Sequence, residues 1–129
     1  MRYIYLIRLN ICISACLFIF LLINASAGTS ITITDRNIDI YGYANNLKIG
    51  DIIKVYDTDN VLCGMFEVTK DGQYGVLHIY GDDMTSPDRD EGPAPGDALS
   101  IFVNDDQVSP TNVDELIWTK NGDLIQVDF

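Results

Sequence analysis

The sequence predicts an all-β protein, a two-sheet antiparallel β-sandwich of immunoglobulin-like type with seven or eight strands. Three observations indicate this fold class. Apolar and polar residues alternate along most segments after residue 28, as in Ile125–Phe129, and a period of two is typical of half-buried strands. Turn residues recur at intervals of about eight to twelve residues, and helical periodicity is nearly absent. A small β-barrel is the alternative fold for the same pattern.

The expected strands follow one another with turn signals between them. Asp57–Asn60 predicts a tight hairpin, and Lys70–Gly72 predicts the next turn. Asn121–Asp123 contains the Asn-Gly pair that favours a two-residue hairpin turn. No linker divides the chain, so one domain is expected. The eight predicted strands are 30–34, 38–44, 51–56, 61–68, 73–80, 98–104, 115–119 and 123–128.

Residues 1–27 are predicted to be a secretory signal peptide. A basic start precedes the apolar run Ile11–Ile23, and Ala25–Ala27 is a small-residue cleavage site. Cleavage after Ala27 leaves one domain at residues 28–129. No membrane span is expected in this mature chain, and the apolar run itself is shorter than the roughly twenty residues that cross a bilayer. The protein is therefore expected to be secreted, at the cell surface or periplasmic, with an uncleaved N-terminal anchor as the alternative.

The charge of the expected mature chain restricts its partners. All nineteen Asp and Glu residues lie after residue 27, against six Lys and Arg, which gives a net charge of −13. This balance excludes nucleic acid as a partner, since phosphate binding requires a basic surface. An extracellular protein or a polysaccharide is the expected partner, and the acidic surface also favours cations or a basic protein surface.

Residue types that perform catalysis are scarce. Cys63 is the one cysteine after residue 27, so it has no internal disulfide partner, and its apolar neighbours favour a buried position. His78 is the single histidine and lies within an apolar strand. No pattern supports a thiol nucleophile, and zinc would require three or four His and Cys ligands. The sequence therefore predicts that the protein is not an enzyme.

The most unusual segment is 80-YGDDMTSPDRDEGPAPGD-97, which lies between two predicted strands. Its carboxylates, prolines and glycines make a long loop rich in hard oxygen ligands. Calcium binds about six to eight such oxygens, so calcium is the candidate cofactor, although the spacing is not that of an EF-hand. A solvated acidic loop is the alternative. The candidate metal ligands are Asp82, Asp83, Asp88, Asp90, Glu91 and Asp97, with Asp57 and Asp59 as secondary ligands.

Aromatic residues form a second candidate site. A row of exposed rings on one sheet would stack on the apolar faces of sugars, while neighbouring carboxylates bind the hydroxyls. The alternative interpretation is that the rings are half-buried strand residues, since tyrosine and tryptophan favour strands. The candidate ligand-binding residues are Tyr41, Tyr43, Tyr56, Tyr80 and Trp118.

Much of the chain after residue 49 carries a specific residue pattern: VYDTDNVLCGMFEV, GQYGVLHIYGDD, DEG and PGDALSIFVN, followed by WTKNGDLIQV. This pattern resembles an accessory immunoglobulin-like β-sandwich module of secreted bacterial multidomain proteins, which has a hairpin of the type YDxDGxxCGxF. The present chain differs in having Asn60 at the glycine position. The resemblance implies an immunoglobulin-like fold and an accessory, non-catalytic role.

Together these features predict a secreted, non-catalytic binding or interaction module, with calcium as a candidate stabiliser of the acidic loop at residues 81–97. Two other functions stay open. One is a carbohydrate-binding module that uses exposed aromatic rings. The other is a structural subunit that assembles at the cell surface through its edge strands.

Overall fold

Seven strands make up the secondary structure of the described chain. The computed structural model describes residues 30–129, so the predicted signal peptide lies outside the described residues. Within this range, no helix is long and apolar enough to cross a bilayer. The strands are β1 (Asn37–Tyr43), β2 (Ile52–Tyr56), β3 (Leu62–Glu67), β4 (Gln73–Tyr80), β5 (Ser100–Val103), β6 (Asp106–Val108) and β7 (Leu124–Gln126).

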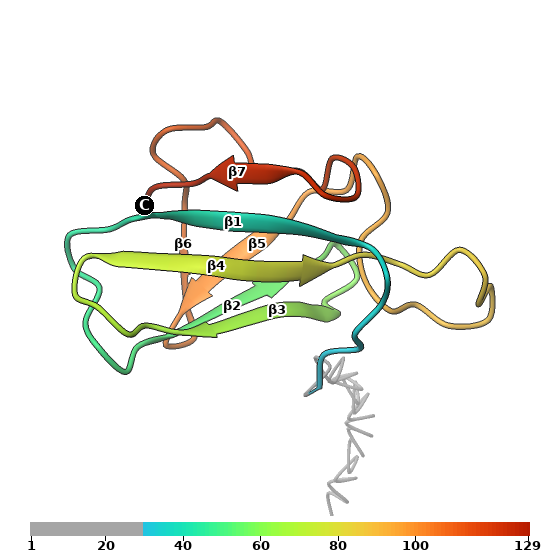
Figure 1. Ribbon diagram of the computed structural model, residues 1–129, viewed down its shortest axis with the longest axis horizontal. Helices are drawn as coiled ribbons and strands as arrows, with labels where there is room; N and C mark the ends of the chain where they lie inside the picture. The colour runs from blue at the N-terminus through green and yellow to red at the C-terminus, as the bar shows by residue number, and fades with distance from the viewer. Residues whose placement is uncertain (1–29) are drawn as a thin grey trace, which may run out of the picture.

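The strands form a two-sheet sandwich, which confirms the predicted all-β fold class (Figure 1). One sheet has three strands in the order β4-β1-β7, and the other has four in the order β3-β2-β5-β6. Neighbouring strands are antiparallel except β1 and β7, which run parallel. The parallel pair departs from the predicted antiparallel pattern. It joins segments that are far apart in sequence, so no local turn signal predicts the pairing.

Six predicted strands are present, with ends that lie within two residues of the expected ones. Two other expectations are wrong. Residues 30–34 form no strand, and 115–119 make only an isolated bridge, between Ile117 and Ala98. The sequence pattern missed β6, which is short and polar and follows Asn104 and Asp105, both at positive φ. Two such residues build the mirror-image turn of tight hairpins.

Side chains alternate between the two faces of each strand, so one set lies in the space between the sheets. Ile38 and Ile40 of β1 and Ile53 and Val55 of β2 are completely buried. Burial of each such side chain stabilises the fold by about 1.5–3 kcal/mol. Trp118 is the largest fully buried side chain. Other core residues are Ala44, Leu47, Cys63, Val68, Tyr74, Leu77, Ile79, Leu99, Ile101, Leu116 and Val127.

The remaining strand side chains lie on the two outer faces, where a ligand can reach them. Along β1, Asp39, Tyr41 and Tyr43 alternate with the buried residues and therefore face away from the core. The long loop between β4 and β5 contains the acidic residues and extends beyond one end of the sandwich (Figure 1). The outer face of the three-stranded sheet, with Tyr41 and Tyr43, and this loop hold many of the site residues that the sequence predicts.

Candidate functional site

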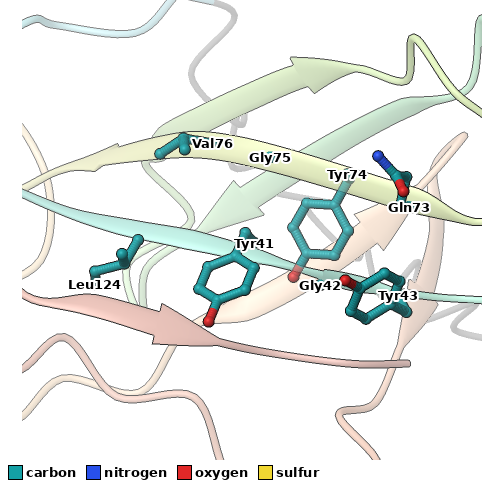
Figure 2. Close-up of a pocket in the computed structure, with 8 residues that line it drawn as sticks. All are labelled: Tyr41, Gly42, Tyr43, Gln73, Tyr74, Gly75, Val76 and Leu124. Atoms are coloured by element: carbon teal, nitrogen blue, oxygen red, sulfur yellow. The ribbon is translucent and has the colours of Figure 1, made fainter.

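A groove with a volume of about 350 Å³ crosses the outer face of the three-stranded sheet. Figure 2 shows Tyr41 in its middle, with Leu124 on one side and Tyr43 on the other. We call it the tyrosine groove. Its lining residues are Tyr41, Gly42, Tyr43, Gln73, Tyr74, Gly75, Val76 and Leu124.

Large apolar side chains are exposed around this groove. Tyr43 is 56% exposed, Val76 48% and Leu124 62%, and they come from three adjacent strands, β1, β4 and β7. Single exposed apolar residues are ordinary on protein surfaces, whereas a contiguous group that lines a hollow is typical of an interaction site.

A bulge in β4 opens the groove. Ile40 pairs with Leu77 and Gly42 pairs with Tyr74, so Gly75 and Val76 together face Tyr41 across the ladder. Gly75 has a φ of +118°, a conformation that favours glycine. A Cβ at this position would lie 2.5 Å from the Cβ of Tyr41. The missing side chain at residue 75 therefore leaves room for Tyr41.

Tyr74 forms the floor of the groove. Its hydroxyl donates a hydrogen bond of 2.6 Å to the Val127 carbonyl, and its ring packs 5.2 Å from the ring of Phe129. Burial, with Asp128 nearby, raises the pKa of the Tyr74 hydroxyl above its ordinary value. The floor is therefore a fixed, neutral surface, and the half-buried Tyr41 ring and the exposed Tyr43 ring are the aromatic groups available to a ligand.

A polar cluster lies beside the groove on the same outer face. Asp39 pairs with His78 across β1 and β4, and the His78 Nδ1 atom lies 2.6 Å from the Asp39 Oδ1 atom. The Asn37 side-chain amide donates to the same carboxylate oxygen at 2.7 Å. His78 is more than half exposed. These groups offer hydrogen-bond donors and acceptors next to the apolar groove.

A second hollow, of about 230 Å³, lies on the four-stranded sheet. It is lined by Tyr56, Asn60, Phe102 and Asp105, and we call it the Tyr56–Phe102 corner. The two rings are 5.4 Å apart and nearly perpendicular, at 86°. Tyr56 lies in the four-stranded sheet, whereas Tyr41 and Tyr43 lie in the three-stranded sheet. The predicted aromatic residues therefore do not form one row.

Trp118 is not available to a ligand, which corrects the prediction that it binds one. Its side chain is completely buried, and its indole nitrogen donates to the Ile79 carbonyl at 3.3 Å. The Arg36 guanidinium lies 5.3 Å from the ring centre. A Cβ at Gly81 would lie 2.6 Å from the indole ring. Trp118 is thus a core residue that anchors the start of the acidic loop. Tyr80 is half-buried at the end of β4.

Carboxylates of the acidic loop are largely used by the loop itself. Asp83 accepts hydrogen bonds from the backbone and the hydroxyl of Thr85, and Asp97 accepts one from the Ala94 backbone. Glu91 is 5% exposed, and the Ser86 hydroxyl lies 2.9 Å from each of its carboxylate oxygens. These are local turn interactions of the kind that Asp and Ser form in loops.

The turn at Asp57 lies near enough to the acidic loop for the carboxylates of the two segments to raise one another's pKa values. Asp57 is 5% exposed and accepts the backbone N–H groups of Asp59 and Val61. Burial raises the pKa of Asp57, and the negative charges of Asp90 and Asp59 add to this effect. Desolvation also raises the pKa of Asp90, with contributions from Asp59, Asp82 and Glu91.

This approach does not build a metal centre. Across residues 30–129, no group of three or more His, Cys, Asp or Glu side chains is placed to hold a metal ion. Asp88 and Asp59 are exposed, and the Asp82 carboxylate accepts a weak hydrogen bond from the Glu91 backbone at 3.4 Å. The eight predicted ligands therefore do not form a preformed calcium site, and calcium binding would require the loop to rearrange.

Cys63 is a buried thiol. Its Sγ atom lies 3.2 Å from the Val55 carbonyl oxygen, and it is completely buried. Burial, with the charges of Asp57 and Asp90 nearby, raises the pKa of the thiol far above its ordinary value. A neutral, inaccessible thiol is a poor nucleophile, so Cys63 has a packing role in the core.

Several lining residues of the tyrosine groove were not among the sequence-predicted site residues. Gln73, Val76 and Leu124 come from β4 and β7, and the bulge at Val76 and the parallel pairing of β7 place two of them in the groove lining. A glycine beside an aromatic residue in a strand is a signal for such a bulge.

No protein-family model matches the chain, and neither the curated proteins nor the solved structures include a significant match.

Proposed function

We propose that this protein is a non-catalytic binding module that holds a polysaccharide in the tyrosine groove. The observation that carries the proposal is the pair formed by half-buried Tyr41 and exposed Tyr43, which both line a hollow on the outer face of the three-stranded sheet. A sugar ring has an apolar face of C–H groups, and the faces of aromatic rings provide a matching rigid surface at low entropic cost.

Polar groups at both ends of the groove complement the hydroxyls of a sugar. Gln73 contributes an amide inside the groove, and the linked His78 and Asp39 side chains lie beside it. The net charge of −13 in the chain after residue 27 repels polyanions. The favoured ligand is therefore a neutral or amino-bearing polysaccharide.

The chemistry of the lining supports binding rather than hydrolysis. Glycoside hydrolysis in most families uses two carboxyl groups on opposite sides of the scissile bond. The residues that line the groove are tyrosines, glycines, one amide and two aliphatic side chains. None of these lining groups would act as a tuned acid–base pair.

Strand addition, the structural alternative, finds little support at two of the sheet edges, those of β7 and β6. At β7, the Asn112 side-chain amide donates to the Gln126 carbonyl at 3.0 Å, and the Thr111 backbone donates to the Asp128 carbonyl. The β6 edge is three residues long and begins with an aspartate. Covered, short or charged edges are typical of sheets that do not add strands.

Affinity electrophoresis tests the proposal. Residues 28–129 are run through native gels that contain a neutral glucan or xylan, soluble chitosan, or alginate. We expect retardation by at least one neutral or amino-bearing polymer, and none by alginate. Tyr41→Ala and Tyr43→Ala should each weaken retention about tenfold, whereas Tyr41→Phe should keep it.

Met84→Ala is the matched control, because Met84 is a 76% exposed side chain in the acidic loop that does not line the groove. Unretarded migration in every neutral and amino-bearing gel would contradict the proposal. Equal loss in the Met84→Ala variant would also contradict it, because the loss would then not depend on the groove.

A further inference from the structure

We propose that the Tyr56–Phe102 corner is a second carbohydrate site, which takes a single sugar ring on the outer face of the four-stranded sheet. The inference rests on the proposed function of the tyrosine groove for its ligand class, but on separate residues. The two sites lie on opposite sheets of the sandwich. One domain would then bind two polysaccharide chains and crosslink them.

The aromatic surface of the corner comes from two paired strands. Phe102 of β5 pairs with Lys54, and Tyr56 lies two residues further along β2. The two rings are therefore diagonal neighbours on one face. Because they are nearly perpendicular, one ring presents its face where the other presents its edge. This arrangement leaves an apolar corner in which one face of a sugar ring can stack.

Polar groups stand at the two ends of the corner. Asn60 is in the turn that follows β2, and Asp105 is in the turn that follows β5. Since β2 and β5 run antiparallel, these turns lie at opposite ends of the paired rings. Hydroxyls project from the rim of a sugar ring, so an amide at one end and a carboxylate at the other fit its outline.

An ion pair holds the carboxylate in place. The Lys54 Nζ atom lies 2.7 Å from the Asp105 Oδ1 atom, which leaves Oδ2 to accept a hydrogen bond from a hydroxyl. The ammonium group also compensates the charge of Asp105, so the corner suits a neutral ligand better than a cation. Its volume of about 230 Å³ is below the roughly 300 Å³ at which pockets for drug-sized ligands begin. A single sugar ring is the size class that fits.

Isothermal titration tests the second site with an oligosaccharide from the polymer that retards the protein most. We expect two ligands per domain for the wild type. Asn60→Gly should weaken one of the two sites about tenfold and leave the other unchanged. Glycine tolerates the positive φ of residue 60, which is 62°, so this variant removes the amide while it preserves the fold. Phe102→Ala should abolish the same site, and Met65→Ala, at an exposed position of the same sheet, should have no effect.

The outcomes separate the two proposals. One ligand per domain, lost with Tyr41→Ala and unaffected by Asn60→Gly and Phe102→Ala, would overturn the second site and retain the tyrosine groove. One ligand per domain, lost with Phe102→Ala and unaffected by Tyr41→Ala, would overturn the groove and retain the corner. Precipitation of the soluble polysaccharide by the wild type, but not by Asn60→Gly or Tyr41→Ala, would support crosslinking by two sites.

Discussion

The acidic loop and the outer face of the three-stranded sheet differ in how far their functional groups are already engaged. The loop has the more conspicuous sequence, yet Asp83, Asp97 and Glu91 accept hydrogen bonds from neighbouring groups of the same loop. The sheet face has an ordinary strand sequence, yet Tyr43 and Leu124 are more than half exposed beside a hollow. A ligand can gain more from rings that face water than from carboxylates that already have partners.

The difference shows that composition alone does not identify a site. Carboxylates in a loop with prolines and glycines have two uses, since they bind a cation or they fix turns through backbone N–H groups. Position in the fold decides between these uses. We therefore propose a structural role for the loop and a binding role for the sheet, and the following predictions test this division.

The largest effect is expected for Trp118→Ala. This side chain is completely buried, and the Gly96 and Asp97 backbones of the acidic loop are hydrogen-bonded to the Trp118 backbone. Removal of the indole should lower the free energy of unfolding by about 3–5 kcal/mol, measured by urea denaturation. If the loop has a structural role, polysaccharide affinity of the folded fraction should be unchanged. A loss below about 1 kcal/mol would show that Trp118 does not anchor the core.

A smaller effect, with a definite sign, is expected for Asp57→Asn. The raised pKa of Asp57 means that the folded state binds its proton more tightly than the unfolded state does. Stability is therefore lost as the pH rises through these pKa values. Asparagine keeps an oxygen for the two backbone N–H groups and removes the charge. We expect Asp57→Asn to raise the free energy of unfolding by about 1 kcal/mol at pH 7 and to leave it unchanged below about pH 3.

Asp83→Asn is the matched control for that experiment, because it should have the opposite sign. Hydrogen bonds from the Thr85 hydroxyl and backbone lower the pKa of Asp83, so its ionised form stabilises the folded state at neutral pH. That contribution is lost as the pH falls through the folded pKa. Urea unfolding at several pH values measures both variants. Destabilisation by Asp57→Asn at pH 7 would contradict the account of the buried turn.

The smallest effect is expected from calcium. Since the loop carboxylates are engaged and residues 30–129 contain no preformed metal cluster, we expect the melting temperature of residues 28–129 to differ by less than about 2 °C between excess EDTA and millimolar calcium. Calcium at a hundred times its dissociation constant would raise the free energy of unfolding by about 2.7 kcal/mol. This corresponds to an increase of many degrees in the melting temperature of a domain of this size. A shift of that size, abolished by Asp82→Asn together with Asp83→Asn, would restore the calcium site.

Much of the fold could be predicted because its signals are local. The alternation along β1 and the turn residues before β4 are properties of consecutive residues, and the strand β4 occurs at the predicted range. What the sequence does not show is long-range pairing. The parallel contact of β1 with β7 brings Leu124 beside the groove, and no local pattern encodes it.

The site could be predicted only in part for the same reason. Tyr41 and Tyr43 were identified by residue type, and they do line a groove. The assignment of Tyr56 to the other sheet and the burial of Trp118 depend on which strands pair and which segments cross the core. Residues 115–119 alternate like a strand, but their pattern reflects core packing of Leu116 and Trp118 with only one bridge.

A two-dimensional NMR titration of labelled residues 28–129 with the retained oligosaccharide tests the central claim most directly. The account predicts that the largest amide shift changes occur in residues 41–43 and 73–76 and at Leu124, with a second group at Tyr56 and Phe102. Shift changes confined to residues 81–97 would contradict the account and would assign the binding role to the acidic loop.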